Sequence, residues 1–239
     1  MEDIAPELYN EIEKKFTAAV QSDSRIKSVV NKLKSGRGTQ ADMRAVSERL
    51  GKHASDAMKE VLVVDRLPDG KLYWNIAERT IKPVLEQVHQ TVNTLATLEQ
   101  RTVDLKHHVN VAVKMGRDPA EHIRTVMGFA TNSVSQEELS NALGEPVRTT
   151  ALDFLDDFQN VNAEERANVG VRQMVIREYD GVGLRSGACN WCLERAGTWD
   201  YQDAKDNGVF ERHPGCGCTI EVFYEDDLEG EGDYGSVPF

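Results

Sequence analysis

Several features are scarce in this sequence of 239 residues, and each scarcity excludes a kind of protein. No run of about 18 apolar residues occurs, so we expect no helix that spans a bilayer and no membrane association. The first residues, Met1, Glu2 and Asp3, are acidic and precede no apolar stretch of the kind found in secretory signals, so we expect no export. Cysteine is rare as well: the four cysteines all lie between Cys189 and Cys218.

Basic residues are scarce in the second part of the chain. Residues 1–150 carry 21 Lys+Arg and 21 Asp+Glu, whereas residues 151–239 carry 7 and 19. The whole net charge of -12 therefore lies in the last 89 residues. Strong binding to nucleic acid depends on clustered Lys and Arg, so neither part favours it. Two parts of such different charge are expected to have different roles.

Apolar residues in the N-terminal part recur at the spacing of α-helices. The strongest pattern is a stripe over residues 76–98, which predicts a long amphipathic helix over about residues 73–103. Pro83 lies inside this stripe, and because proline removes one helical hydrogen bond, we expect a kink or a helix start near it. Thr39 and Ser135 each precede a helical pattern and are expected to be N-caps.

The C-terminal part has a different pattern. Residues 173–179 favour a short strand, and residues 218–224 alternate polar and apolar side chains as a half-buried strand does. We therefore predict a mainly α protein with an elongated helical region over residues 1–165. A small α+β zinc-binding domain is expected over residues 166–224, followed by an acidic, solvated tail over residues 225–239.

Two groups of polar residues are interpreted as solvated. For Asp153, Asp156 and Asp157, a solvated helix face is favoured over a metal-binding pair. For His107 and His108, a solvated pair is favoured over a pair of ligands. No serine or cysteine nucleophile with a suitable histidine and acid can be assembled from the sequence, so we expect no catalytic residues and no enzyme.

The residues that carry chemistry are the cysteines and one histidine. Cys189 and Cys192 form a C-x2-C pair, and after twenty further residues His213, Cys216 and Cys218 form a second group. Two residues between thiols let both sulfurs face one ion, and zinc accepts Cys and His ligands in mixture. We therefore predict one structural Zn²⁺ ion with these five residues as candidate ligands.

Five candidates for four positions leave alternatives open. The favoured set is Cys189, Cys192 and His213 with one of Cys216 or Cys218, and Cys218 is the better fixed of these two because it begins the expected strand. An all-cysteine site with His213 outside it is the main rival. Two disulfides, a redox C-x2-C pair and a catalytic zinc with an open position are further alternatives.

The cysteine-rich stretch resembles a known family. It reads Cys189-Asn190-Trp191-Cys192-Leu193-Glu194-Arg195-Ala196-Gly197-Thr198-Trp199, followed by Val209-Phe210-Glu211-Arg212-His213-Pro214-Gly215-Cys216-Gly217-Cys218-Thr219. It resembles the MuF-like head-morphogenesis family, the minor head proteins of tailed bacteriophages, whose signature is C-x2-C, an LAG-x-aromatic stretch and H-x2-C-x-C-T before a strand. Arginine at position 195 departs from the commoner leucine. Looser similarity over residues 67–80, 143–147 and 154–158 extends the resemblance to most of the chain.

This resemblance implies a structural virion protein that joins the head during assembly, in low copy, near the portal vertex. The portal protein and the major capsid protein are the implied partners, and self-association through the long helices is a further candidate contact. The implied location is the virion head, internal or close to the portal, with the host cytoplasm during assembly. Strong nucleic-acid binding is not expected, because the cysteine-rich part is acidic.

Two other functions are kept as alternatives. A zinc-dependent nuclease or hydrolase of treble-clef type would use Glu194 or Glu211, which lie near the ligands in the sequence, as its acid or base. A nucleic-acid-binding zinc module would need a basic surface, which the charge distribution argues against. Trp191 and Trp199 flank the metal-binding stretch and are expected to pack over it and shield the thiolates.

Overall fold

The computed structural model describes residues 3–179, 189–213 and 215–229. Within these residues, helices come first and a small three-stranded sheet follows, which confirms the prediction of a mainly α protein with a small C-terminal sheet. The first part contains α1 (Ala5–Ser22), α2 (Ser24–Lys34), α3 (Gln40–Val61), η1 (Val64–Arg66), η2 (Pro68–Gly70), α4 (Trp74–Lys106), α5 (Ala120–Thr131), α6 (Gln136–Ala142) and α7 (Glu145–Ala167). The second part contains β1 (Gln173–Glu178), α8 (Asn190–Leu193), β2 (Gly197–Asp200), α9 (Tyr201–Asp206), β3 (Thr219–Tyr224) and α10 (Glu225–Glu229).

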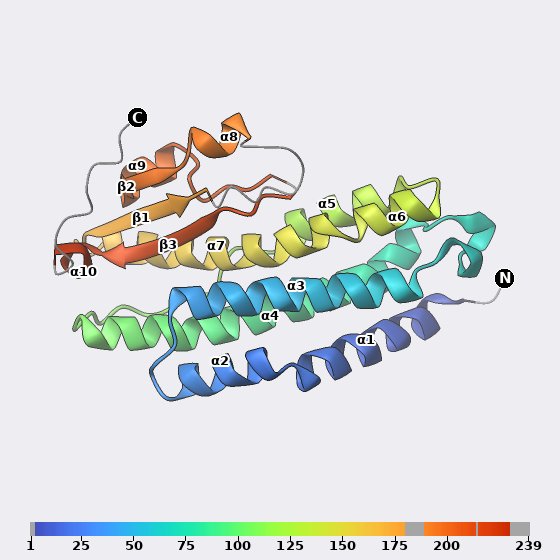
Figure 1. Ribbon diagram of the computed structural model, residues 1–239, viewed down its shortest axis with the longest axis horizontal. Coiled ribbons are helices and arrows are strands. Elements are labelled where there is room, and N and C mark those ends of the chain that lie inside the picture. Colours follow the sequence, from blue (N-terminus) through green and yellow to red (C-terminus); the bar gives the residue numbers. More distant parts are fainter. Residues whose placement is uncertain (1–2, 180–188, 214, 230–239) are drawn as a thin grey trace.

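The helices form an elongated bundle in which α3, α4 and α7 run along the long axis of the molecule (Figure 1). Helix α4 includes the residues of the predicted apolar stripe. Of these, Ile81, Leu85 and Val92 are completely buried against the neighbouring helices. This helix begins at Trp74 and continues through Pro83, so the helix start expected near the proline is wrong. Burial of one face of α4 stabilises the bundle, because each fully buried aliphatic side chain contributes roughly 1.5–3 kcal/mol.

Local capping explains where two of these helices begin. The Thr39 hydroxyl accepts a hydrogen bond from the backbone N–H of Asp42 (3.2 Å), and the Ser135 hydroxyl accepts one from Glu138 (3.2 Å). Each bond satisfies a backbone donor that the first turn of a helix leaves unpaired. Both predicted N-caps are therefore confirmed.

The sheet has the order β2-β1-β3, with both pairs antiparallel. Val175 of β1 and Ile220 of β3 pack with Ala163 of α7 and Tyr201 of α9 in a small apolar cluster. The free edge of β3 faces α3, where the Gln40 side chain bonds both the N–H (2.7 Å) and the carbonyl of Val222. A side-chain amide thus occupies the hydrogen-bonding groups that an edge strand would otherwise expose.

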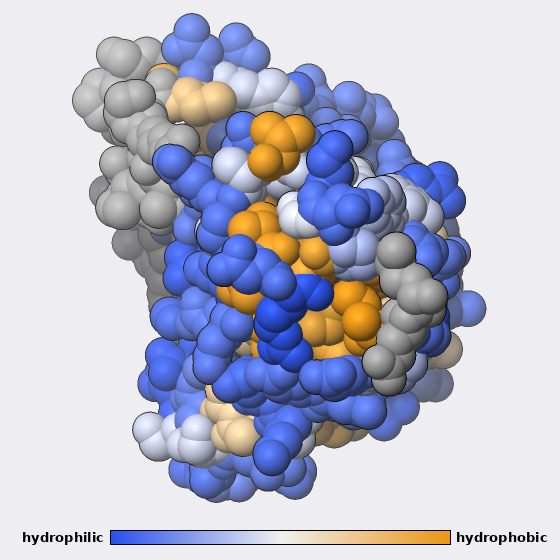
Figure 2. Space-filling model, turned by 90° about the vertical axis from the view of Figure 1, so that its right-hand side faces the viewer, coloured by the Kyte–Doolittle hydropathy of each residue, from blue (hydrophilic) through white to orange (hydrophobic). Residues whose placement is uncertain are grey.

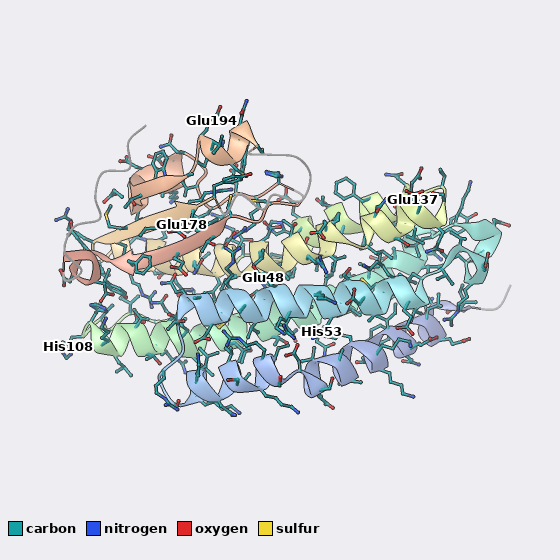
Figure 3. All side chains as sticks on the ribbon, in the orientation of Figure 1. Glu48, His53, His108, Glu137, Glu178 and Glu194 are labelled. Atoms are coloured by element: carbon teal, nitrogen blue, oxygen red, sulfur yellow. The ribbon has the colours of Figure 1, made fainter. Side chains whose placement is uncertain are left out.

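The start of the expected acidic tail is folded. Residues 225–229 form α10, and the Asp227 carboxylate lies 2.5 Å from Lys106 Nζ and 2.9 Å from His107 Nε2 at the end of α4. The His107 ring also stacks on Tyr224, with 4.4 Å between ring centroids. The interpretation of His107 as solvated is therefore wrong, whereas His108 is exposed as expected (Figure 3). Residues 230–239 of the expected tail lie outside the described residues.

The opposite end of the bundle carries the connection between α3 and α4. Figure 2 shows apolar side chains gathered there in a hollow among polar ones. A pocket of about 460 Å³ at this end is lined by Ile4, Pro68, Tyr73 and Arg79, and Trp74 is 44% exposed beside it. Among the helices that the structure describes, none has the length and apolar character needed to cross a bilayer.

Candidate metal centre

The first pair of cysteines sits on one tight turn. Cys189 is the residue before α8, and its carbonyl accepts the backbone N–H of Cys192 (2.9 Å). This one-turn geometry brings the two side chains to the same side of the chain, as the C-x2-C spacing predicts. In the second group, Gly215 has φ of 81°, a conformation that favours glycine and lets the chain bend between His213 and Cys216.

All five predicted ligands meet around the Cys192 sulfur. Potential ligand atoms of Cys189, Cys192 and His213 lie within 4.8 Å of one another, and so do the sulfurs of Cys192, Cys216 and Cys218. Cys192 Sγ lies 3.0 Å from His213 Nε2 and 3.8 Å from Cys216 Sγ. The two groups share one sulfur, so they form a single cluster drawn from α8 and from the loop before β3.

The donor atoms fit a metal ion. The four cysteines, all in the described part of the chain, have free thiols, which argues against the disulfide alternative. Cys192, Cys216 and Cys218 are buried, with at most 4% of each exposed, and Cys189 is half-buried. Thiolate and imidazole donors converging on a buried point are the chemistry that zinc accepts in structural sites. The cluster could therefore bind a metal ion.

Two buried arginines face the sulfurs, and no pattern in the sequence marks either of them. Arg177 Nη2 lies 3.5 Å from Cys216 Sγ and 4.0 Å from Cys192 Sγ, and Arg212 Nη1 lies 3.9 Å from Cys216 Sγ. Both arginines are held by backbone carbonyls as well: Arg177 donates to Val209 (2.5 Å), and Arg212 donates to Cys218 (2.7 Å). Cations at this distance stabilise thiolates over thiols.

The electrostatic environment differs from one cysteine to the next. A hydrogen bond from Cys218 and the nearby Arg212 charge lower the pKa of Cys216 to about 4, although burial opposes this. The same hydrogen bond raises the pKa of Cys218, and burial raises the pKa of Cys192. These shifts favour the thiolate form of Cys216, the form that binds metals.

Of the two tryptophans, only Trp191 covers the cluster. Its ring meets the His213 ring edge-on, with 5.5 Å between centroids, and the guanidinium groups of Arg177 and Arg195 lie 5.0 Å and 4.0 Å from its centroid. Trp199 packs instead against the apolar cluster of the sheet, and its Nε1 donates to the Arg195 carbonyl (3.2 Å). The expectation that both tryptophans shield the thiolates is wrong for Trp199, because β2 carries its side chain to the sheet.

The loop that carries His213, Cys216 and Cys218 is fastened to the helical bundle. The Gly215 N–H donates to the Thr149 hydroxyl of α7 (3.0 Å), and Arg44 of α3 donates to the Gly217 carbonyl (2.6 Å). Arg44 also bonds the Thr219 hydroxyl. The loop that carries three of the candidate ligands is therefore held against α3 and α7, whereas Cys192 lies in α8 and Cys189 directly before it.

The three aspartates of α7 are not a solvated face. Asp156 is 2% exposed and forms a two-bond ion pair with Arg212, so it connects α7 to the cysteine cluster. Asp157 lies 2.9 Å from His122 Nε2, and burial raises the pKa of Asp153 to about 7. The predicted solvated face is wrong because the sheet and α5 both pack on this side of the helix.

The two glutamates considered as acid or base are exposed. Glu194 follows α8 with 72% of its side chain exposed, and Figure 3 shows it at the outer end of that helix. Glu211 is exposed as well. Neither lies in a closed environment of the kind that adjusts a carboxyl group for catalysis.

The chain was compared with models of protein families, with curated proteins and with solved structures, and none of these comparisons gave a match.

Proposed function

We propose that this chain is a structural minor head protein of a tailed bacteriophage, in which one structural zinc ion joins α8 to the loop before β3 and stabilises the small C-terminal part. One observation supports the metal part of this proposal. Four cysteine sulfurs and one imidazole lie close together around Cys192, and three of the sulfurs are buried. The assignment to phage heads is supported by the resemblance of residues 189–199 and 209–219 to the MuF-like family.

A structural role for the metal agrees with how the cluster is enclosed. Three of the four sulfurs are buried, and Trp191 and two arginines cover the cluster. A catalytic zinc keeps one coordination position open to water and has an acid or base nearby. Here five donors compete for four positions, and Glu194 faces solvent.

A role in assembly agrees with the shape and surface of the bundle. The long helices offer extended faces, and the end seen in Figure 2 presents an apolar hollow. Exposed apolar surface of this kind is typical of contacts with other proteins, for which the portal protein and the major capsid protein are the proposed partners. Self-association through the long helices is a further contact of the same kind.

The experiment is to purify virions and procapsids of the phage or prophage that encodes this chain. We expect the chain in both, in low and constant copy, and cross-linked to the portal or the shell. Its absence from both particles would contradict the proposal. A nuclease or hydrolase would instead lose a measurable activity in Glu194→Gln or Glu211→Gln while it kept its zinc.

A further inference from the structure

Among the residues that the structure describes, Arg177 is a fully buried cation that forms no ion pair with a carboxylate. The residue is 1% exposed, and its guanidinium donates to the carbonyls of Val209 (2.5 Å) and Glu211 (2.7 Å). Its other contacts are the Cys192 and Cys216 sulfurs and the face of Trp191. In the part of the chain that the structure describes, no Asp or Glu lies within 4 Å of it. A buried charge needs a compensating charge, because removing it from water costs several kcal/mol.

The other charges near the sulfurs are already matched. Arg212 is paired with the buried Asp156 through two hydrogen bonds. Asp153 and Asp157 of α7 lie beside His122 of α5, with their carboxylate oxygens 3.7 Å and 2.9 Å from its ring nitrogens. Two guanidinium charges against the single carboxylate of Asp156 leave one positive charge, and that charge belongs to Arg177.

The metal centre would supply the missing negative charge. A divalent ion with three thiolates and a neutral imidazole has a net charge of -1, whereas four thiolates give -2. Together with the positive charge of Arg177, the set of three thiolates and one imidazole is neutral. The set of four thiolates keeps one negative charge that Arg177 does not balance. Burial therefore favours the set that includes His213.

Resting on the proposed zinc centre, we propose that Arg177 is its counter-cation and positioning residue, and that it favours three thiolates plus His213 over four thiolates. Arg177 donates toward Cys192 and Cys216, so these two sulfurs are anions in the ligand set. The third thiolate comes from Cys189 or Cys218. In small zinc sites, groups that hold the ligands change metal affinity by about 10–100-fold when they are removed.

The first test measures zinc affinity by chelator competition in the full-length chain. Arg177→Gln should bind zinc about 10–100-fold more weakly than the wild type, and Arg177→Lys, which keeps the charge, should recover most of that loss. Arg195→Gln is the matched control, because the Arg195 guanidinium lies 4.0 Å from the centroid of the same indole and donates to the Trp191 carbonyl rather than to a sulfur. Equal affinities of Arg177→Gln and the wild type would overturn the proposal.

A second test does not depend on whether Arg177→Gln folds. The absorption spectrum of the wild-type chain loaded with Co²⁺ distinguishes three sulfurs and one nitrogen from four sulfurs. We expect the former, and at least one of Cys189→Ser and Cys218→Ser should retain one zinc per chain. A four-sulfur spectrum, or loss of zinc in both variants, would overturn the ligand set. A wild-type chain that binds no metal would instead contradict the proposed function itself.

Discussion

The helical bundle and the C-terminal sheet are stabilised by different means. The bundle has a continuous apolar core that runs through α1 to α7, whereas the core of the sheet is a small cluster around Val175, Tyr201 and Ile220. Beside that cluster lie buried sulfurs and the ion pair of Asp156 with Arg212. An apolar cluster this small contributes little stability by itself. The difference teaches that buried sulfurs and a buried ion pair take the place of a large hydrophobic core in the C-terminal part.

The largest effect should come from removing the metal. Cys192→Ser removes the one sulfur common to both donor groups, so zinc should be lost and the C-terminal sheet should unfold. Metal binding contributes on the order of 10 kcal/mol in zinc-dependent peptides. Limited proteolysis should then cut after residue 167, while far-UV circular dichroism retains most of its helical signal. A variant as protease-resistant as the wild type would remove the contrast between the two parts.

The next largest effect concerns the ion pair of Asp156 with Arg212, which joins the bundle to the C-terminal part. Asp156→Ala leaves the Arg212 guanidinium buried without its partner, which we expect to cost about 3–5 kcal/mol of unfolding free energy. Asp56→Ala, which removes the exposed partner of Lys52, is the matched control and should cost less than about 0.5 kcal/mol. Urea unfolding measures both. Equal losses in the two variants would show that burial of the Asp156 pair does not matter.

A substitution in the bundle core should lower the stability of the bundle without releasing zinc. Leu85→Ala removes a fully buried side chain of α4 and should cost about 2–5 kcal/mol. The variant should keep its zinc at 25 °C, because Leu85 lies in the bundle core rather than near the cysteines. Thermal unfolding with parallel metal analysis measures this. Loss of zinc from the folded variant would mean that the two parts are not stabilised separately.

The smallest effect depends on pH at the contact between the two parts. Glu99 of α4 is 7% exposed beside Tyr224, and burial with the nearby Asp104 raises its pKa from 4.5 to about 8. The folded state therefore holds a proton that the unfolded state has lost, so stability falls as the pH rises from about 4.5 to about 8. A cavity of about 20 Å³ at this carboxyl can hold one water molecule, which moderates the penalty.

Glu99→Gln should remove this slope. We expect the variant and the wild type to have similar unfolding free energies at pH 5, and the variant to be the more stable of the two at pH 9. Glu78→Gln, at an exposed position of the same helix, is the control and should behave as the wild type does. Parallel curves for the wild type and Glu99→Gln across this range would contradict the burial of a protonated Glu99.

Much of the fold could be predicted because it depends on local patterns. The stripe of α4, the caps Thr39 and Ser135, and the alternation in β3 each involve neighbours in the sequence. The spacing of the C-x2-C pair and of the group around His213 likewise predicts a metal site. The spacing of residues does not predict which polar side chains become buried in the fold.

The misinterpreted residues show why the rest could not be predicted. Asp156 looks like any charged residue on an amphipathic helix until the sheet packs on it and Arg212 reaches it from 56 residues away. Arg177 in β1 and Gln40 at the start of α3 receive no role from their local sequence patterns. Each acquires its role through a contact distant in the sequence, which an isolated pattern does not encode.

The central claim is that one metal ion at the cysteine cluster stabilises the C-terminal part of the chain. Native mass spectrometry of the full-length chain, purified without added metal, tests it most directly. We predict a mass that corresponds to one zinc ion per chain in the wild type and to the metal-free chain in Cys192→Ser. A wild-type chain that remains metal-free even after incubation with equimolar Zn²⁺ would contradict the account.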